Sequence, residues 1–455
     1  MLTVPQPEHS LSADIARFVR AFAGSAPRRA TEIACAGFAD TIGVMFAGTR
    51  ESEEATIVDR ALGTGGRGAF IIPGMRECSP SHAALVNATA AHALDYDDVA
   101  LDGHPSAVLV PAILAVAGER TPTGRQIVDA YLVGYEVWAA LCERKTSALH
   151  NFGWHPTCVF GAITAAAACS FLAQLSEQQI QFALGIAASM TSGLMGNFGS
   201  MTKPFQVGRA AEAGVVAARL ARAGLTSSTT IFERSPGFFD AFYRDAPLSA
   251  PPIGERRHIE ATGLNVKRYP ICYCAQRAVD GVLGLIRRHS LQASDVASVA
   301  VQIGDVQNRI LRFSEANSVP EAKFCLEYCV AVTLAKGRLG LAELSPDLIH
   351  SPAIKGLMKK VSREVVPSAP GDVFAPADRV SIVTQDGRCL DSGPIAHAKG
   401  SFETPLSKEE LFDKFSDCLG PGRDSTRVRA LFDRCFELDR APSIDGLVAA
   451  LRAFE

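Results

Sequence analysis

The feature that most constrains the fold of this chain is the long helical periodicity of its first half. From Ala13 to about Thr262 the apolar residues recur at the spacing of a helix face and alanine is abundant. Short turns such as Ile72-Pro73-Gly74 separate these segments. The sequence therefore predicts that residues 1–262 are all helical.

A different pattern begins at about Asn265. Apolar and polar residues alternate over Val296 to Ile303 and again over Arg379 to Thr384. The second of these segments is followed by Asp386-Gly387, a dipeptide typical of a tight hairpin turn. We therefore expect a smaller α/β domain over residues 263–396.

Helical periodicity returns near the end of the chain, where Ser407 and Glu410 have the spacing of a helix capping box. With 455 residues the chain is too long for one core of ordinary size. We expect a mostly α protein in which residues 397–455 return to the helical domain. The α/β domain would then be an insertion in it.

The composition argues against several classes of function. Lys and Arg number 45 against 48 Asp and Glu, and no block of like charge suits a nucleic acid or an anionic membrane. The first 18 residues contain prolines and acids where a signal peptide needs a basic start and an apolar run, so we expect a cytoplasmic protein. Residues 157–175 approach membrane-spanning length, but their Ala, Thr and Gly favour a packed core helix.

The twelve cysteines are scattered and include no Cys-x-x-Cys pair. An iron–sulfur cluster or a structural metal site usually needs such paired ligands. We therefore expect buried thiols, no cofactor and no metal.

Four predicted helix starts carry a proline just after or near a basic or imidazole side chain. Proline is suited to the first helical position, and the free N–H groups of a helix start attract anions. Several such starts in one cleft would hold a multiply charged carboxylate. The four are Gly103-His104-Pro105-Ser106, Trp154-His155-Pro156-Thr157, Thr202-Lys203-Pro204-Phe205 and Lys267-Arg268-Tyr269-Pro270.

Three carboxylates, Asp95, Asp97 and Asp98, precede His104 at the end of a predicted helix. The helix dipole repels negative charge there, so another group should compensate for it. We expect these acids to orient His104 or to meet substrate and lysine. Asp97 also fits a solvated acidic turn.

Five segments of the chain together resemble the MmgE/PrpD family, in the same order. The segments are AHALDYDDVALDGHPSAVLVPAILAVAGE, GWHPTCVFGAITAAAA, NFGSMTKPFQVGRAAEAGVVAARLARAG, KRYPICYCAQRAVDG and EAKFCLEYCVAV. The family includes 2-methylcitrate dehydratases, cis-aconitate decarboxylases and iminodisuccinate epimerases. The resemblance implies an all-helical domain with an α/β lid, usually as a homodimer, with a metal-free site in the cleft between the domains.

The resemblance also implies site residues. Asp95, His104, His155, Lys203 and Lys267 occupy positions where family members place active-site groups. A hinge near residue 265 would close the lid, with its lysine, over the substrate.

Four positions depart from patterns seen in the family. Gln206 and Gln276 each stand where a histidine is frequent. Cys272 stands where animal cis-aconitate decarboxylases carry histidine but many bacterial family members carry cysteine, and Val99 replaces a hydroxyl residue of those decarboxylases. These departures argue against naming the protein a decarboxylase.

The residues suit removal of a proton next to a carboxylate. Lys203 and Lys267 would stabilise the enediolate-like intermediate, and histidine is the natural proton carrier near neutral pH. We predict that His104, steered by Asp95, moves the carbon-bound proton and that His155 handles the proton on the other side. These two roles could be exchanged.

Further substrate contacts are predicted for Asp98, Cys272 and Tyr273. The substrate would be a small di- or tricarboxylic acid.

One such intermediate leads to dehydration, epimerisation or decarboxylation. Dehydration is the first choice because it needs one base, one acid and carboxylate clamps. Epimerisation follows closely, since residues 153–157 and 197–204 resemble iminodisuccinate epimerases. Outside these reactions stand a helical metabolite-binding protein and, disfavoured by the cysteine spacing, an iron–sulfur hydratase.

Overall fold

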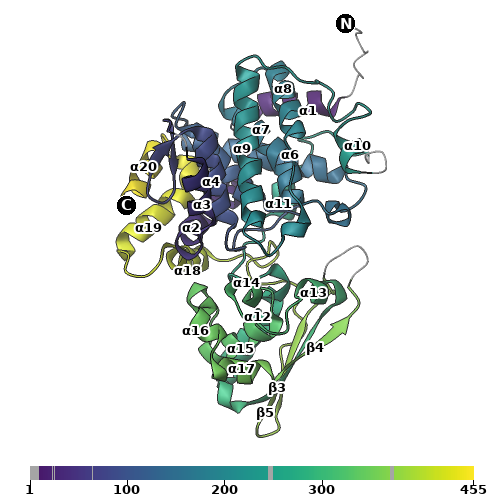
Figure 1. The fold of residues 1–455 in the computed structure, drawn as a ribbon, viewed down its shortest axis with the longest axis vertical. Coiled ribbons are helices and arrows are strands. Elements are labelled where there is room, and N and C mark those ends of the chain that lie inside the picture. Colours follow the sequence, from purple (N-terminus) through teal and green to yellow (C-terminus); the bar gives the residue numbers. More distant parts are fainter. Residues whose placement is uncertain are drawn as a thin grey trace. The chain divides into compact units, whose positions relative to one another are not determined.

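The computed structural model describes residues 10–22, 24, 26–63, 65–243, 249–368 and 374–454. It divides into two compact units, a helical unit of residues 1–264 and 411–455 and a sheet unit of residues 265–410 (Figure 1). Helices predominate in both, so the prediction of a mostly α protein is confirmed.

The unit boundaries differ from those expected from the pattern. The first lies after residue 264 rather than 262, and the second lies after residue 410 rather than 396. Hydrogen bonds hold the chain after residue 396 to the sheet unit. Val266 N donates to Gly400 O at 2.8 Å, and Lys399 N donates to the Asp280 side-chain oxygen Oδ2 at 2.6 Å.

The centre of the helical unit is a group of four helices: α4 (Pro80–His92), α5 (Pro105–Ala117), α7 (Pro156–Leu172) and α9 (Thr202–Arg222). Helix α9 packs along both α4 and α7, and α5 also contacts these two. Glycine allows the close approach, because a Cβ on Gly208 would overlap Leu85 O and one on Gly214 would overlap Ala165.

Around this centre lie the other helices of the unit. They are α1 (Leu11–Ala21), α2 (Arg28–Glu51), α3 (Glu54–Leu62), α6 (Gly124–Glu143), η1 (Leu149–Phe152), α8 (Glu177–Ser189), η2 (Met195–Asn197), α10 (Phe238–Phe242) and α11 (His258–Thr262). The return segment adds α18 (Lys408–Leu419), α19 (Ser425–Phe436), η6 (Leu438–Arg440) and α20 (Asp445–Arg452).

The return segment behaves as expected. The capping box at the start of α18 is present, with Ser407 N donating to Glu410 Oε2 at 2.9 Å and Glu410 N to Ser407 Oγ at 3.2 Å. Helix α19 packs on α2, and α20 packs on α19.

The prediction that residues 1–262 are all helical is wrong at one turn. Strands β1 (Ala69–Ile71) and β2 (Arg76–Cys78) form a small antiparallel hairpin. Its physical cause is Asn87 of α4, which accepts from Ile72 N at 2.8 Å and donates to Phe70 O at 2.9 Å. The Asn87 side chain thereby supplies hydrogen-bond partners to two backbone groups that have none from a helix.

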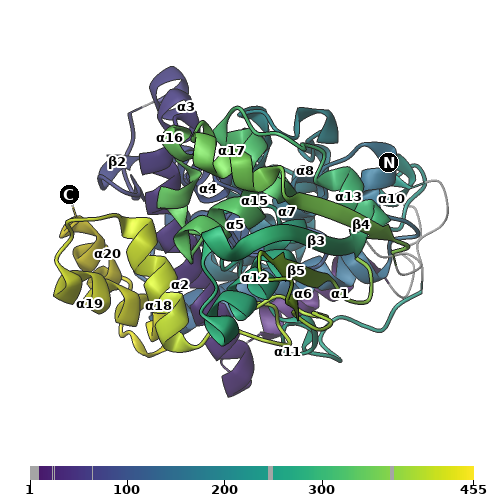
Figure 2. The same cartoon turned by 90° about the horizontal axis from the view of Figure 1, so that it is seen from below.

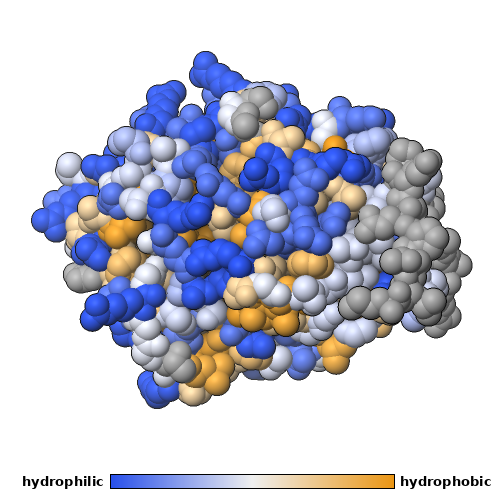
Figure 3. Space-filling model, turned by 90° about the horizontal axis from the view of Figure 1, so that it is seen from above, coloured by the Kyte–Doolittle hydropathy of each residue, from blue (hydrophilic) through white to orange (hydrophobic). Residues whose placement is uncertain are grey.

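Among the described helices, α2 is the one with the length and apolar character to cross a membrane, and 83% of its apolar window is buried inside the protein. Helix α7, which covers most of the apolar stretch noted above, is buried along almost its whole length. Figure 3 shows one face of the molecule, where hydrophilic side chains predominate and apolar ones are scattered among them.

The sheet unit is built on four strands in the order β4-β3-β5-β6. Strand β3 (Val296–Gly304) pairs in parallel with β4 (Val361–Val366) and antiparallel with β5 (Arg379–Thr384). Strand β6 (Cys389–Asp391) pairs antiparallel with β5, which confirms the hairpin predicted at Asp386-Gly387.

Helices α12 (Gln276–His289) and α15 (Leu326–Lys336) pack on each other and on this sheet, α12 over β5 and α15 over β4 (Figure 2). The remaining elements of the unit are η3 (Tyr273–Ala275), η4 (Ala293–Asp295), α13 (Asp305–Ile310), α14 (Val319–Ala322), η5 (Leu341–Leu344), α16 (Pro346–Ile349) and α17 (Pro352–Met358).

The helix start predicted at Pro270 is wrong, because α12 begins only at Gln276. The buried Gln276 side chain donates to Tyr269 O at 2.8 Å and to Ile271 O at 3.2 Å, and accepts from Tyr269 N at 3.2 Å. These bonds hold residues 269–271 in a non-helical bend. The glutamine that replaces a frequent histidine therefore has a structural role.

Candidate active site

The candidate site lies in the helical unit, around the segment between α4 and α5. We call residues 95–104 the acid loop. Three of its non-glycine residues, Asp95, Leu101 and Asp102, have positive φ angles of 53°, 50° and 62°. Such a conformation costs free energy and persists only where the surroundings hold it in place. The indole of Trp138 supplies one such contact by donating to Leu101 O at 3.1 Å.

Asp97 lies at the centre of the site and contacts two imidazoles. Its Oδ2 atom is 2.9 Å from Nδ1 of His92 and 3.0 Å from Nδ1 of His104. The Asp97 side chain has no exposed surface, so the solvated acidic turn considered above is wrong. Burial by itself raises the pKa of Asp97, but the two imidazoles and their hydrogen bonds hold it well below its usual range.

These contacts fix the tautomers of both histidines. His104 Nδ1 also lies 2.8 Å from the carbonyl oxygen of Asp98, which can only accept, so this nitrogen carries the hydrogen. The ionised Asp97 imposes the same choice on His92. Each neutral ring then presents Nε2 as its basic nitrogen. Burial lowers the pKa of His92 to about 4, against the attraction of Asp97, so that this ring is neutral at pH 7.

We predicted that Asp95 steers His104, but the carboxylate that the structure places on His104 is that of Asp97. Asp95 instead pairs with Lys203, whose Nζ lies 2.8 Å from its Oδ1. The left-handed conformation of Asp95 turns the chain directly after α4, so the spacing in sequence does not tell which acid reaches the imidazole.

His155 joins the same cluster from the start of α7. It precedes Pro156 as the N-cap, and its backbone N donates to Gly193 O at 3.0 Å. Its ring centre lies 5.9 Å from that of His92, and its Nδ1 is 3.2 Å from Cys158 Sγ. Burial lowers the pKa of His155 well below its usual value.

Phe198 connects this histidine to the lysine of the site. Its ring centre is 4.9 Å from that of His155 and 5.3 Å from Lys203 Nζ. The side chains of Lys203 and His104 are each 13% exposed, whereas His92 and Asp97 are fully buried. Lys203, its partner Asp95 at 15% exposure and His104 therefore form the accessible edge of the cluster.

Asp98 is predicted to bind substrate, but its side chain is fully buried beneath the loop. Burial raises the pKa of this carboxyl to about 8, against the effect of hydrogen bonding by Ser106 and with a further contribution from the nearby Asp40 carboxylate. A buried, protonated acid fits a role in holding the loop rather than a substrate contact.

The donor atoms of His92, Asp95, Asp97 and His104 lie within 4.8 Å of one another, a spacing that could hold a metal ion. The Asp97 oxygen, however, already accepts from two Nδ1–H groups, and Asp95 is paired with the Lys203 ammonium. A cation would have to displace both sets of contacts. The donor set fits a proton-carrying network better than a metal centre, and metal independence stays a prediction.

Lys267, Cys272 and Tyr273 belong to the sheet unit. Lys267 and Cys272 are buried there, at 1% and 6% exposure. Cys272 precedes η3 and Tyr273 begins it, rather than following a helix start at Pro270. Their contribution to the site stays a prediction.

Gln206 lies on α9, the helix that carries Lys203, and contacts the segment to which the His155 backbone is bonded. Its Nε2 donates to Leu194 O at 3.3 Å, next to Gly193, whose carbonyl accepts from the backbone of His155. The glutamine thus supports the segment that positions the histidine.

The sequence interpretation missed His92 and misjudged Asp97. One signal was present for His92, which is the basic residue in the last turn of the helix that leads into the acidic segment.

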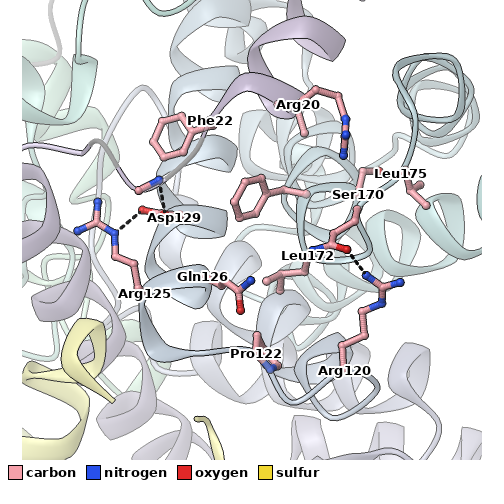
Figure 4. Close-up of a pocket in the computed structure, with 14 residues that line it drawn as sticks. Arg20, Phe22, Arg120, Pro122, Arg125, Gln126, Asp129, Ser170, Leu172 and Leu175 are labelled. Carbon is pink, nitrogen blue, oxygen red and sulfur yellow. Dashed lines mark hydrogen bonds and ion pairs between the residues drawn. The ribbon is translucent and has the colours of Figure 1, made fainter. Parts of the chain in front are cut away.

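A separate cavity of about 830 Å³ lies elsewhere in the helical unit (Figure 4). Arg20, Arg120 and Arg125 line it together with Phe22 and Leu175. Two of the arginines are already engaged, Arg125 by Asp129 at 2.9 Å and Arg120 by Gln174 at 3.0 Å. The cavity shares no residue with the acid loop, so its volume is not that of the candidate site.

Comparison with known proteins bears on the family of the chain. The model of the MmgE/PrpD N-terminal domain matches residues 13–250 and that of the MmgE/PrpD C-terminal domain matches residues 269–438. The cis-aconitate decarboxylase of Mus musculus is 28% identical over 77% of this chain and 72% of its own length, and that of Aspergillus terreus (strain NIH 2624 / FGSC A1156) is 27% identical over 83% and 82%.

A second named activity occurs among the relatives. The 2-methylcitrate dehydratase of Cupriavidus necator is 23% identical over 80% of this chain and 81% of its own. Both names denote lyases that act on small carboxylic acids. Because the two domain models together match most of the sequence, the chain is a member of the MmgE/PrpD family.

Proposed function

We propose that this protein is a lyase that removes a proton next to a carboxylate of a small di- or tricarboxylic acid, and that it dehydrates a hydroxylated tricarboxylate. The observation that carries the proposal is the pair of Asp97 contacts, which direct Nδ1 of His104 toward the carboxylate and leave Nε2 as a base. His104 is also partly exposed, as a base that meets a substrate must be.

The reaction needs positive charge close to this base. Removing a proton next to a carboxylate places a second negative charge on that group, and fixed cations stabilise it. Lys203 supplies one such cation at the edge of the cluster. In the proposal its ammonium exchanges Asp95 for the substrate carboxylate, and Lys267 supplies a second cation.

The second proton belongs to His155. Burial keeps its imidazole neutral in the free protein, and the nearby positive charge of Lys203 acts in the same direction. In the proposal His155 takes up a proton from solvent when the anionic substrate binds and passes it to the leaving hydroxyl, which departs as water, while His104 takes the proton on carbon. The two roles remain interchangeable, because both rings belong to one cluster.

Decarboxylation is the second candidate. It is favoured by the relatives, since the two cis-aconitate decarboxylases named above are 28% and 27% identical and the 2-methylcitrate dehydratase 23%. The replacements at Val99 and Cys272 argue the other way. Epimerisation of an iminated dicarboxylate would use the same intermediate, with a proton returned to the opposite face.

Proton exchange tests the proposal directly. The purified protein is incubated in D2O with citrate, 2-methylcitrate, cis-aconitate or aspartate-derived diacids, and each acid is followed by NMR. We expect deuterium to enter a hydroxylated tricarboxylate together with loss of water. Carbon dioxide released from cis-aconitate would instead identify the decarboxylase, and inversion of a diacid the epimerase.

Two histidine variants make this test specific. His104→Ala should abolish the exchange, whereas His82→Ala should retain it. His82 is also buried against a carboxylate, Asp59 at 2.8 Å, but lies outside the cluster. Exchange in neither the native protein nor any variant, with a ligand still bound, would support the helical metabolite-binding protein instead.

Three further expectations have their own measurements. A colourless protein whose activity survives a chelator would support the absence of a metal or an iron–sulfur cluster. Light scattering on the purified protein tests the homodimer. Equal small-angle scattering profiles with and without a saturating acid would contradict closure of the sheet unit as a lid.

A further inference from the structure

The acid loop is held from its buried side by the C-terminal return segment. Lys414 of α18 donates from Nζ to the backbone oxygen of Tyr96 at 2.8 Å. The same ammonium lies 4.0 Å from the centre of the Tyr96 ring. Tyr96 stands between Asp95, which pairs with Lys203, and Asp97, which contacts both imidazoles.

The counter-ion of this lysine is Asp40, in the apolar helix α2. Lys414 Nζ and Asp40 Oδ1 are 2.6 Å apart, and their side chains are only 3% and 1% exposed. A buried ion pair is weak evidence for stability, because removing two charges from water offsets much of their attraction. A backbone acceptor in the acid loop gives the lysine a purpose that an apolar residue could not fulfil.

The shape of the loop explains why it needs such an anchor. Asp95 has a left-handed conformation immediately before Tyr96, and Leu101 and Asp102 share it further along. Lys203 and the two imidazoles engage the carboxylates of the loop, and Lys414 engages its backbone. Contacts from both sides are what keep an unfavourable backbone conformation populated.

We propose that Lys414 is a positioning residue, which holds the Tyr96 carbonyl so that Asp97 meets the Nδ1 atoms of His92 and His104. This inference rests on the proposed function only for its effect on turnover. Its effect on the imidazoles concerns the free protein and can be measured without any substrate.

The test uses three variants of the full chain. Lys414→Met leaves Asp40 buried without its counter-ion and should lower the melting temperature strongly. The double variant Asp40→Leu/Lys414→Met removes both charges and should regain most of that stability. Asp413→Asn, a change of an exposed neighbour on the same helix, is the matched control.

The decisive sample is the double variant. We expect the Nδ1 protons of His92 and His104, followed by imidazole NMR, to exchange with solvent at least tenfold faster than in the native protein. We also expect kcat to fall at least tenfold while KM changes less than twofold, since the base is displaced but the substrate clamps remain. Asp413→Asn should match the native protein in every measurement.

A stable double variant with native imidazole signals would overturn the proposal, because Lys414 would then serve stability alone. Altered imidazole signals in a protein without turnover of any acid would still support Lys414 as the anchor, and would count against the proposed function instead.

Discussion

Two polar networks in this protein are built on different principles. In the sheet unit, Arg363 forms an ion pair with Glu327, donating to its two oxygens at 2.8 and 2.6 Å. The same guanidinium donates to the backbone oxygens of Leu311 and Phe313 and to the amide oxygen of Asn308. Every part of this charged group has an acceptor.

In the acid loop of the helical unit, by contrast, the hydrogen bonding of the side chains is incomplete. The Nε2 atom of His92 and the Oδ1 atom of Asp97 are buried without a hydrogen-bond partner. Within the described residues, no buried side-chain atom of the sheet unit is in that state.

The difference separates a structural network from one suited to chemistry. A fully satisfied network holds one conformation, whereas a buried donor or acceptor without a partner costs free energy and calls for an explanation. For the acid loop, the explanation that we propose is a set of groups kept ready to exchange protons. Single substitutions in the two networks would test this contrast.

Asp97→Asn should lower kcat/KM by about 10²- to 10⁴-fold, because an amide can donate to an imidazole and reverse its tautomer. The urea concentration at the midpoint of unfolding should stay close to that of the native protein. Steady-state kinetics and urea unfolding provide the two measurements. Asp59→Asn, beside His82, is the control. An equal loss of activity in this variant would show that the effect is not specific to the acid loop.

Arg363→Met should act in the opposite way. It leaves Glu327 buried without its cation and should cost about 3 to 5 kcal/mol of unfolding free energy. Activity per folded molecule should stay native, because this network serves structure. Urea unfolding and active-site titration measure the two effects, and lost turnover in the folded fraction would contradict the comparison.

Asp98→Asn should change the pH dependence of stability. Burial raises the pKa of Asp98 from an ordinary 3.8 to about 8, so the folded protein keeps a proton that the unfolded chain has lost. This contribution is fully present below about pH 4 and is lost as pH rises toward 8, by up to about 1.4 kcal/mol per pH unit.

The asparagine cannot ionise, so its stability relative to the native protein should rise across that window. Urea unfolding of both proteins at several pH values measures the difference. A difference that stays constant from pH 4 to pH 8 would show that Asp98 is already ionised in the fold.

The smallest effect is expected at an exposed pair of the sheet unit. Arg379 and Asp391 lie 2.8 Å apart across the β5–β6 hairpin, and both side chains are more than 40% exposed. Arg379→Ala should change the unfolding free energy by less than about 1 kcal/mol, and salt should reduce the effect further. A loss of unfolding free energy as large as that of Arg363→Met would mean that exposure to solvent does not set the strength of these two ion pairs.

Much of the fold could be predicted from local patterns. The helical periodicity, the Asp386-Gly387 hairpin and the Ser407 capping box each depend on residues a few positions apart. Strand β4 and the hairpin at Ile72 escaped prediction, because each is stabilised by a distant partner, β3 in one case and Asn87 in the other.

The site was predicted in its residue types but not in its pairings. His104, His155 and Lys203 were found at helix starts, where proline gave a local signal. Asp40 carried a weaker signal, because it is an acid in the apolar middle of helix α2, and such an acid is rarely buried without a partner. Nothing in the amphipathic pattern of α18 distinguishes Lys414 from a surface lysine.

By itself, the sequence determined the helix-rich architecture, the family and the presence of histidine, lysine and carboxylate near helix starts. Only the tertiary structure decided that Asp97, rather than Asp95, serves the imidazoles and that Lys414 supports the loop from 318 residues away. The physical reason is that periodicity and capping act within one element, whereas these contacts depend on where separate helices place their side chains in space.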